Sequence, residues 1–368
     1  MIRHDEVPMD KRITISQIAE ESGVSIATVS RVMNGTVRVA PDKRKRVEEV
    51  IARHDFSPSA MARGLASNQS LTLGIILPDI SNPYFAALFL EIERCALEAG
   101  YAVLLCNTLF GGSSHGVPQT VDEAAYFQMM IDKQVDGVLI TGGQIDLEQI
   151  SPSYVQALAR LNRAMPVVVI GQSIPDTGCL FLERESGKGI VSAISHLRAL
   201  GHKRIAFVGG QPGIKITHMR LQAWESTLTA CGLPCGPELV SLSDYYIQDG
   251  YTAMTALLEK KTEFTAFLAI NDMVALGALR ALADQGRKVP EDVAMISCDQ
   301  FSSGEYQIPR ITGIEQQNAH LGRLAILQLI SAIKGNGEQI RFTFTPELVI
   351  RESCGVKLGV RHFPSRKE

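Results

Sequence analysis

Short apolar runs alternate with amphipathic stretches through most of the chain. The stretches between them, such as AALFLEIERCALEAG and DMVALGALRALADQG, repeat apolar residues at helical spacing. This rhythm of strand and helix predicts parallel sheets with helices on both faces, and the number of strands favours two similar α/β subdomains over one sheet. The predicted strands are TLGIILP (72–78), AVLLCN (102–107), GVLITG (137–142), PVVVIG (166–171), RIAFVGG (204–210), AFLAIND (266–272) and VAMISCD (293–299).

The first sixty residues follow only helical patterns. Thr14 to Gln17 reads as a capping box that opens a helix ending near Ser22, with Gly23 free to take the left-handed turn after it. A second helix begins at the N-cap Ser25. A third is predicted over 41–53, where Pro41 suits the first position and the inward face is formed by Val47, Val50 and Ile51. The first two helices form a predicted helix-turn-helix.

The second of these helices has an unusual exposed face. It would bury Val29 and Val32, and it would expose five short side chains and one long one: Ser25, Ile26, Ala27, Thr28, Ser30 and Arg31. Short side chains let a helix approach base edges in a DNA major groove, where Ile26 and Ala27 can touch thymine methyls and Arg31 can reach a guanine. The alternative is an ordinary helical hairpin, whose solvated face would normally carry Glu and Lys.

Charge is distributed unevenly along the chain. Residues 1–70 hold 11 basic and 9 acidic residues, whereas residues 71–368 hold 25 and 30, so a slightly basic head precedes an acidic body. Between Arg31 and Arg46 lie six basic residues and only one acidic residue, Asp42. This pattern favours a polyanionic partner for the head, although a solvated basic face would look the same.

Composition restricts the class of protein. The chain is 45% hydrophobic and 20% charged, which suits a soluble protein of two or three packed units. Its seven cysteines include no C-x-x-C pair and are expected to be small core residues in a reducing cytosol. The start, MIRHDEVPMD, lacks the apolar stretch of a signal peptide, and no run approaches a membrane span. A cytoplasmic protein is expected, with no membrane partner.

The segment SAMARGLAS (59–67) is predicted to be a short, conditional helix. Two turns interrupted by Gly64 would be mostly unfolded in isolation, because short helices bear the cost of nucleation. Leu65 is therefore interpreted as a wedge inserted between base pairs in the minor groove, or alternatively as a linker leucine that rests on the body. The polar SNQS (67–70) reads as a linker, and GGSSHGVPQT (111–120) as a surface loop.

Five motifs, in order along nearly the whole chain, resemble the lactose/galactose repressor (LacI/GalR) family of bacterial transcription regulators. They are ITISQIAEESGVSIATVSRVMNG, SPSAMARGLASNQSLTLGIILPDISNPYF, LRALGHKRIAFVGG, INDMVALGALRALADQGRKVPEDVAMISCDQ and PELVIRESC. The resemblance implies a homodimer on a pseudo-palindromic operator. It also implies a small all-α helix-turn-helix head and an α/β body of periplasmic-binding-protein type I fold, which closes two parallel-sheet subdomains over a small-molecule effector.

The resemblance also implies domain limits and DNA contacts. The expected units are a head at 12–58, a hinge helix and linker at 59–70, a body at 71–356 and a tail at 357–368. Within the body, the N-subdomain is expected at 71–172 and 302–331, and the C-subdomain at 173–301 and 332–356. The expected DNA contacts, with the hinge in the minor groove, are Thr14, Ser25, Ile26, Ala27, Thr28, Ser30, Arg31, Asn34, Ala62 and Leu65.

Effector contacts are carried over by motif position. Arg220, Tyr245, Asn271 and Asp299 match the family's contacts, and their fixed donors, acceptors and aromatic ring suit a sugar or a carboxylate. Weaker candidates across the cleft are Asn82, Tyr84, Phe85 and Gln316, while Asp272 and Trp224 are interpreted mainly as structural. Two departures from the family pattern, Glu185 and the segment SCDQ (297–300), leave the identity of the effector open.

The expected function is an effector-responsive DNA-binding regulator, interpreted as a repressor of a carbohydrate or sugar-acid utilisation operon. A solute-binding protein would share the body but would need a signal peptide and no head. An enzyme on the same scaffold would need a catalytic set, and the chain has no H-E-x-x-H, G-x-S-x-G or phosphate-cradling GxxxxGK[ST] motif. No cofactor or metal is expected.

Overall fold

The computed structural model describes residues 13–33, 39–54, 56, 69–109, 122–184, 187–336 and 346–358. The chain divides into two compact units, Met1–Leu71 and Thr72–Glu368. Several sequence predictions lie outside the described residues. They concern Asn34, Ala62 and Leu65, the hinge helix, Glu185 and the loop at 111–120.

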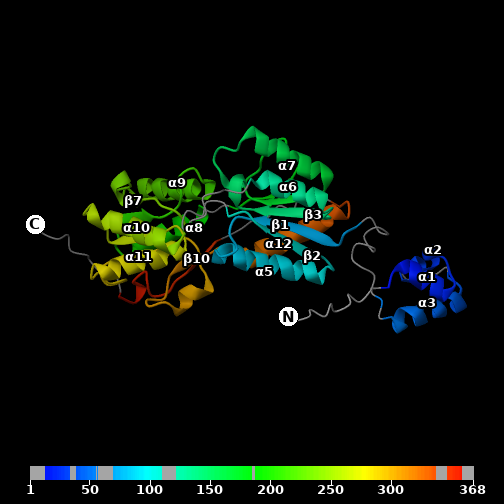
Figure 1. Ribbon diagram of the computed structural model, residues 1–368. Coiled ribbons are helices and arrows are strands. Elements are labelled where there is room, and N and C mark those ends of the chain that lie inside the picture. The colour runs from blue at the N-terminus through cyan, green and yellow to red at the C-terminus, as the bar shows by residue number, and fades with distance from the viewer. Residues whose placement is uncertain are drawn as a thin grey trace, which may run out of the picture. The chain divides into compact units, whose positions relative to one another are not determined.

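The first unit contains the three helices that the sequence predicts (Figure 1): α1 Ile15–Ser22, α2 Ile26–Met33 and α3 Pro41–Arg53. The capping box at Thr14 is confirmed, because Gln17 N donates to Thr14 Oγ1 at 3.4 Å and Thr14 N donates to Gln17 Oε1 at 2.8 Å. Gly23 ends α1 at φ 65°, in the left-handed region that glycine tolerates best. The core joins all three helices through Ile18, Ala19, Val29, Val32, Val47 and Val50.

The second unit begins with a parallel sheet in the order β2-β1-β3-β4-β5. Successive residues of a strand point to opposite faces, so Ile75 of β1 packs under α5 and α12, whereas Ile76 packs under α6 and α7 (Figure 1). The strands are β1 Thr72–Leu77, β2 Ala102–Asn107, β3 Gly137–Thr141, β4 Val167–Ile170 and β5 Leu180–Leu182. The helices are α5 Pro83–Glu98, α6 Glu123–Asp132, α7 Pro152–Ala164 and α12 Asn318–Ile333.

A second sheet follows in the order β11-β10-β9-β8-β6-β7, parallel except for the antiparallel pair of β10 and β11. Helices α8 and α9 cover one face and α10 and α11 the other (Figure 1). The strands are β6 Ile205–Val208, β7 Val240–Ser241, β8 Ala266–Ala269, β9 Ala294–Ser297, β10 Gly313–Glu315 and β11 Glu347–Val349. The helices are α8 Lys188–Ala199, α9 Lys215–Ala230, α10 Ile247–Glu259 and α11 Asp272–Asp284.

The two sheets define an N-subdomain and a C-subdomain, and the chain passes between them after β5, β10 and α12. The expected boundaries between the subdomains, at 172/173 and 301/302, therefore come too early in the chain, because the first sheet continues to β5 and the second to β10. β5 pairs with β4 and completes the first sheet, and β10 pairs with β9 in the second. The limits were misplaced because each of these strands has only three residues and gives no extended apolar run. Within the described residues, no helix is both long and apolar enough to span a bilayer.

Candidate functional site

The exposed face of α2 is built as the sequence predicts. Val29 and Val32 are buried in the core of the first unit, while Ile26 is 50% exposed, and Ala27 and Arg31 also face solvent. Ser25 Oγ accepts from Thr28 N at 3.3 Å and lies 3.0 Å from Thr28 Oγ1, so Ser25 caps the helix. An apolar side chain half open to water at a helix N-terminus suits an apolar contact such as a thymine methyl.

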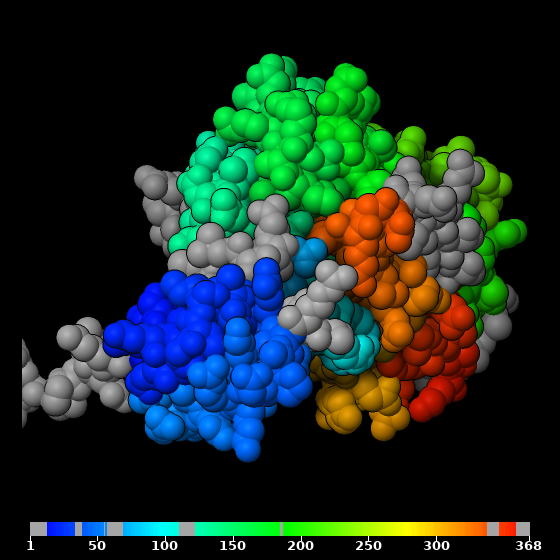
Figure 2. Space-filling model, turned by 90° about the vertical axis from the view of Figure 1, so that its right-hand side faces the viewer, coloured from blue at the N-terminus to red at the C-terminus, as the bar shows by residue number. Residues whose placement is uncertain are grey.

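Basic residues begin the neighbouring helix α3. Lys43, Lys45 and Arg46 are exposed, and Arg46 pairs loosely with Asp42 at 4.0 Å. Figure 2 shows the first unit as a compact body (blue) whose surface includes these helices. An exposed basic first turn beside a helix with short side chains can hold phosphate while α2 reads base edges.

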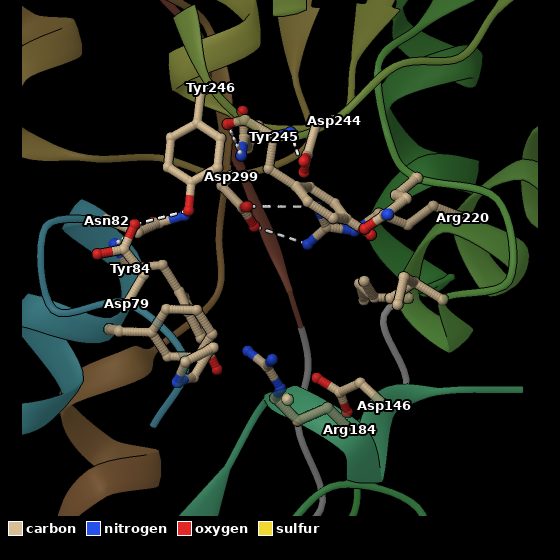
Figure 3. A pocket seen from close by; sticks show the side chains of 17 residues that line it. Asp79, Asn82, Tyr84, Asp146, Arg184, Arg220, Asp244, Tyr245, Tyr246 and Asp299 are labelled. Carbon is tan, nitrogen blue, oxygen red and sulfur yellow. Dashed lines mark hydrogen bonds and ion pairs between the residues drawn. The ribbon is translucent and has the colours of Figure 1, made fainter. Parts of the chain in front are cut away.

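A second site lies in the body, where the carboxyl ends of strands from both sheets face one cavity of about 860 Å³ (Figure 3). Strand ends at such a crevice are where open α/β folds bind ligands. The polar and aromatic lining of the N-subdomain comprises Asp79, Asn82, Tyr84, Phe85, Asp146 and Arg184. The polar and aromatic lining of the C-subdomain comprises Gln211, Arg220, Asp244, Tyr245, Tyr246, Asn271 and Asp299.

Arg220 and Asp299 form a buried, two-pronged ion pair on the C-subdomain side. Arg220 Nη2 donates to Asp299 Oδ1 at 2.6 Å and Nη1 to Oδ2 at 3.2 Å, and Nη1 also donates to the carbonyl of Ile270. Arg220 is 3% exposed, and its Nε is buried without a partner in the described part of the chain. The pair therefore presents a rigid donor to the cavity.

Tyr245 and Asn271 are fixed by the fold. Asn271 Oδ1 caps α11 by accepting from Val274 N at 2.8 Å, and Asn271 Nδ2 donates to the carbonyl of Tyr245 at 2.9 Å. The Tyr245 hydroxyl lies 2.6 Å from Thr217 Oγ1, and burial raises the pKa of Tyr245 to about 12. The structure places all four residues carried over from motif positions on the cavity wall.

The weaker candidates separate into two groups. Asn82, Tyr84 and Phe85 line the cavity, and the rings of Tyr84 and Phe85 meet edge to face at 4.8 Å. Gln316 does not line it. Its side chain is buried and its Nε2 donates to the carbonyl of Cys298 at 2.7 Å, so the amide supports the end of β9 instead.

Five charged or aromatic lining residues were not predicted. Asp79 and Asp244 follow β1 and β7, and a polar residue directly after a strand could have indicated them. Asp146 lies in the short helical turn after β3, and Arg184 lies after β5, with its guanidinium 4.9 Å above the ring of Tyr84. Tyr246 is the N-cap residue of α10.

Several contacts join the subdomains around the cavity. The Tyr246 hydroxyl donates to Asp79 Oδ2 at 2.6 Å (Figure 3). Lys215 Nζ donates to the carbonyl of Ile145 at 3.1 Å, and Glu148 N donates to the carbonyl of Gly213 at 2.9 Å. The described body is therefore closed by contacts of its own chain.

A buried carboxyl group supports the turn that carries Asp146. Glu123 is 1% exposed, and it accepts from Gln144 N and from the Tyr154 hydroxyl, both at 2.8 Å. Burial raises its pKa to about 7. A Cβ on Gly143, which has φ 81°, would lie 2.2 Å from Glu123 Oε1, so this turn requires glycine.

A helix-turn-helix unit followed by a two-subdomain body with a cavity at its strand ends defines the class of ligand-responsive DNA-binding regulators. The model for "Bacterial regulatory proteins, lacI family" matches residues 14–59, and the model for "Periplasmic binding protein-like domain" matches residues 194–354. The chain belongs to the lacI family of bacterial regulatory proteins, helix-turn-helix transcriptional regulators with a periplasmic-binding-protein-like effector domain.

Known relatives and structures agree with this family. The transcriptional repressor PurR of Haemophilus influenzae is 31% identical over 92% of this chain and 98% of its own length. The repressor CytR of Escherichia coli is 30% identical over 92% and 96%. A lac repressor dimer bound to operator and the anti-inducer ONPF superposes with TM-score 0.79 at 25% identity, covering 94% and 99% of the chains. A complex of the regulator CelR with cellobiose superposes with TM-score 0.67 at 26% sequence identity, and the match covers 93% of this chain and 100% of the CelR chain. These relatives are regulators, not enzymes.

Proposed function

We propose that this protein is an effector-responsive repressor that binds a two-fold symmetric operator as a homodimer. The observation that carries the proposal is the exposed face of α2, where Ile26, Ala27 and Arg31 are open to solvent while Val29 and Val32 anchor the helix. This face suits the major groove, and a symmetric dimer would read two half-sites. The lac repressor, which this chain resembles over nearly its whole length, was solved as a dimer on its operator.

The effector in this proposal is a sugar or sugar derivative, and the regulated genes serve the use of a carbohydrate. Support comes from the cavity, whose fixed donor Arg220, acceptor Asp299 and aromatic Tyr245 suit hydroxyl groups on an apolar ring. The similar regulator CelR was solved with cellobiose. Ligand binding would act on DNA by changing which body conformation is populated.

Operator selection from random duplexes tests the DNA part of the proposal. We expect a two-fold symmetric consensus whose binding weakens steeply with salt, because basic residues must displace counterions from phosphates. Arg31→Ala should cost about 1–3 kcal/mol of binding free energy and relax preference at one base pair in each half-site. Arg280→Ala is the control, since this exposed arginine pairs with Asp284 on α11 of the body. An asymmetric consensus, or equal effects of the two substitutions, would contradict the proposal.

A further inference from the structure

The charges around the cavity restrict the chemistry of the ligand further than the proposed function does. We propose that the effector is a hydroxyl- or amine-bearing molecule without an acidic group, so that sugar acids and sugar phosphates are excluded. This inference rests on the proposed function, because it concerns the same cavity. It follows from the sum of the lining charges, from the groups already engaged by the arginines, and from the buried polar atoms that still lack a partner.

Carboxylates outnumber cations on the cavity wall. Among the described lining residues, four carboxylates, Asp79, Asp146, Asp244 and Asp299, face two guanidinium groups, Arg184 and Arg220. The wall therefore has two negative charges in excess. Consider a ligand whose anionic group lies about 6 Å from one such carboxylate, at an effective dielectric constant near 20. The repulsion between the two charges lowers the affinity of the ligand by roughly a hundredfold.

Both arginines are already engaged. Arg220 directs its two terminal nitrogens at Asp299 and at the carbonyl of Ile270. Arg184 stacks on Tyr84 with its Nη1 3.5 Å from Asn318 Oδ1, and its charge acts against the burial that raises the pKa of Asp146 to about 6. Figure 3 shows Arg184 beside Asp146 at one end of the cavity. Neither guanidinium offers the open fork that carboxylates and phosphates require.

Two of the helix N-termini at the cavity already have a carboxylate beside them. Helix N-termini attract anions, but Asp79 precedes α5 and accepts from Ser81 N at 2.9 Å. Asp244 precedes α10 and accepts from Tyr245 N at 2.8 Å, and at the start of α11 Val274 N already donates to Asn271 Oδ1 at 2.8 Å. The remaining helix, α9, presents the side chains of Ile214 and Ile216 to the cavity.

The unsatisfied groups favour hydroxyls. Asp146 is partly buried at the cavity wall and makes no hydrogen bond to the described residues, so its carboxylate oxygens can accept from a donor of the ligand. Arg220 Nε and the Tyr84 hydroxyl are buried without a partner in the same part of the chain. A ligand hydroxyl donates and accepts at once and satisfies both kinds of group, and an amine can serve as the donor to Asp146. The rings of Phe85 and Tyr245 supply apolar surface for the carbon skeleton.

Matched ligand sets test this inference on the full-length protein. Glucose, galactose and ribose are each compared with their aldonic acid, their phosphate ester and their amino derivative. Binding is measured by calorimetry and by release from the selected operator. For any scaffold that binds, we expect the acid and the phosphate to be weaker than the neutral or amino member by roughly a hundredfold. An acid or phosphate that binds as tightly as its neutral counterpart overturns the inference.

Charge-neutralising variants separate this inference from a steric effect. Asp244→Asn keeps the acceptor for Tyr245 N and removes one negative charge. It should lower the ratio of the affinity for a neutral ligand to that for its acidic counterpart by roughly tenfold. Asp176→Asn, at an exposed position of the N-subdomain, should leave the ratio unchanged. If the ratio of neutral to acidic ligand affinity is the same in both variants and in the parent protein, the inference is overturned. If no member of any set binds or releases operator, the failure is that of the proposed effector response itself.

Discussion

At the scale of single residues, burial of two carboxyl groups makes the stability of the body depend on pH. Burial raises the pKa of Glu123 and of Asp272 to about 7. Both groups therefore hold a proton in the folded state at pH values where the unfolded chain has released it. Since the folded state binds more protons between about pH 4 and 7, the free energy of unfolding should fall as pH rises through this window.

Glu123→Gln tests the contribution of Glu123 to this effect. The amide can accept from Gln144 N and donate to the Tyr154 hydroxyl, so the substitution removes the charge and keeps the local contacts. We expect the loss of stability between pH 5 and 8, measured by urea unfolding, to shrink by about 1–3 kcal/mol. The control is Glu225→Gln, at an exposed position on α9. Parallel pH profiles for the two variants would show that Glu123 does not titrate in this range.

The Arg220–Asp299 pair provides a second test at the same scale. Removing one partner leaves a buried charge without compensation, so Arg220→Met or Asp299→Asn alone should cost about 3–5 kcal/mol of unfolding free energy. The double variant should cost less than the sum of the singles, because neither charge then remains. Denaturant unfolding of all four proteins measures this coupling. Additive costs would mean that the two side chains do not depend on each other.

At the scale of elements, α10 and α11 pack with their backbones in contact. A Cβ on Gly277 would lie 1.9 Å from the carbonyl oxygen of Ile247, and a Cβ on Gly250 would lie 2.2 Å from that of Val274. Backbone atoms cannot move aside as a flexible side chain can. Figure 1 shows the two helices side by side.

Gly277→Ala should therefore destabilise the body by more than about 3 kcal/mol through overpacking, despite the better helix propensity of alanine. Gly171→Ala is the control, because its Cβ would meet its nearest neighbour, Ile145, at an ordinary 3.5 Å. Thermal unfolding of the two variants compares the effects. A Gly277→Ala protein as stable as the control would show that α10 and α11 can separate without cost.

The same scale shows what the sequence could and could not predict. The seven predicted strands all form, within a few residues of their expected limits, because each contains a run of apolar residues, and all but the edge strand β2 are largely buried. The short strands β5, β7, β10 and β11 have two or three residues and are recognised only by their pairing partners, which periodicity does not show. The crossovers that depend on them were misplaced for the same reason.

The residues that line the cavity also divide into those that the sequence predicts and those that it does not. Arg220, Tyr245 and Asp299 follow strands or motifs that are readable in the sequence, and they line the cavity as expected. Asp146 lies in a short helical turn and Arg184 follows an edge strand, so their convergence depends on tertiary structure alone. The excess of carboxylates, which restricts the ligand, is therefore visible only once both sheets are in place.

At the scale of the whole body, one of the hydrogen bonds that join the subdomains ends on a carboxylate of the cavity wall. The Tyr246 hydroxyl of the C-subdomain donates to Asp79 Oδ2 of the N-subdomain at 2.6 Å. A hydrogen bond to a carboxylate contributes about 1.5–3 kcal/mol, and this one exists only while the cleft is closed. It therefore biases the balance of open and closed bodies before any ligand binds.

Tyr246→Phe should shift this balance toward the open body by roughly tenfold or more. Energy transfer between one dye on each subdomain measures the open fraction in the ligand-free protein. Tyr251→Phe is the matched control, since the Tyr251 hydroxyl donates to Asp284 Oδ2 at 3.2 Å within the C-subdomain alone. In a repressor whose operator affinity depends on closure, Tyr246→Phe would also change ligand-free operator affinity, while Tyr251→Phe would not. An open fraction that is equal in the two variants would show that the remaining cross-cleft contacts, from Lys215 and Glu148, are sufficient to hold the body closed.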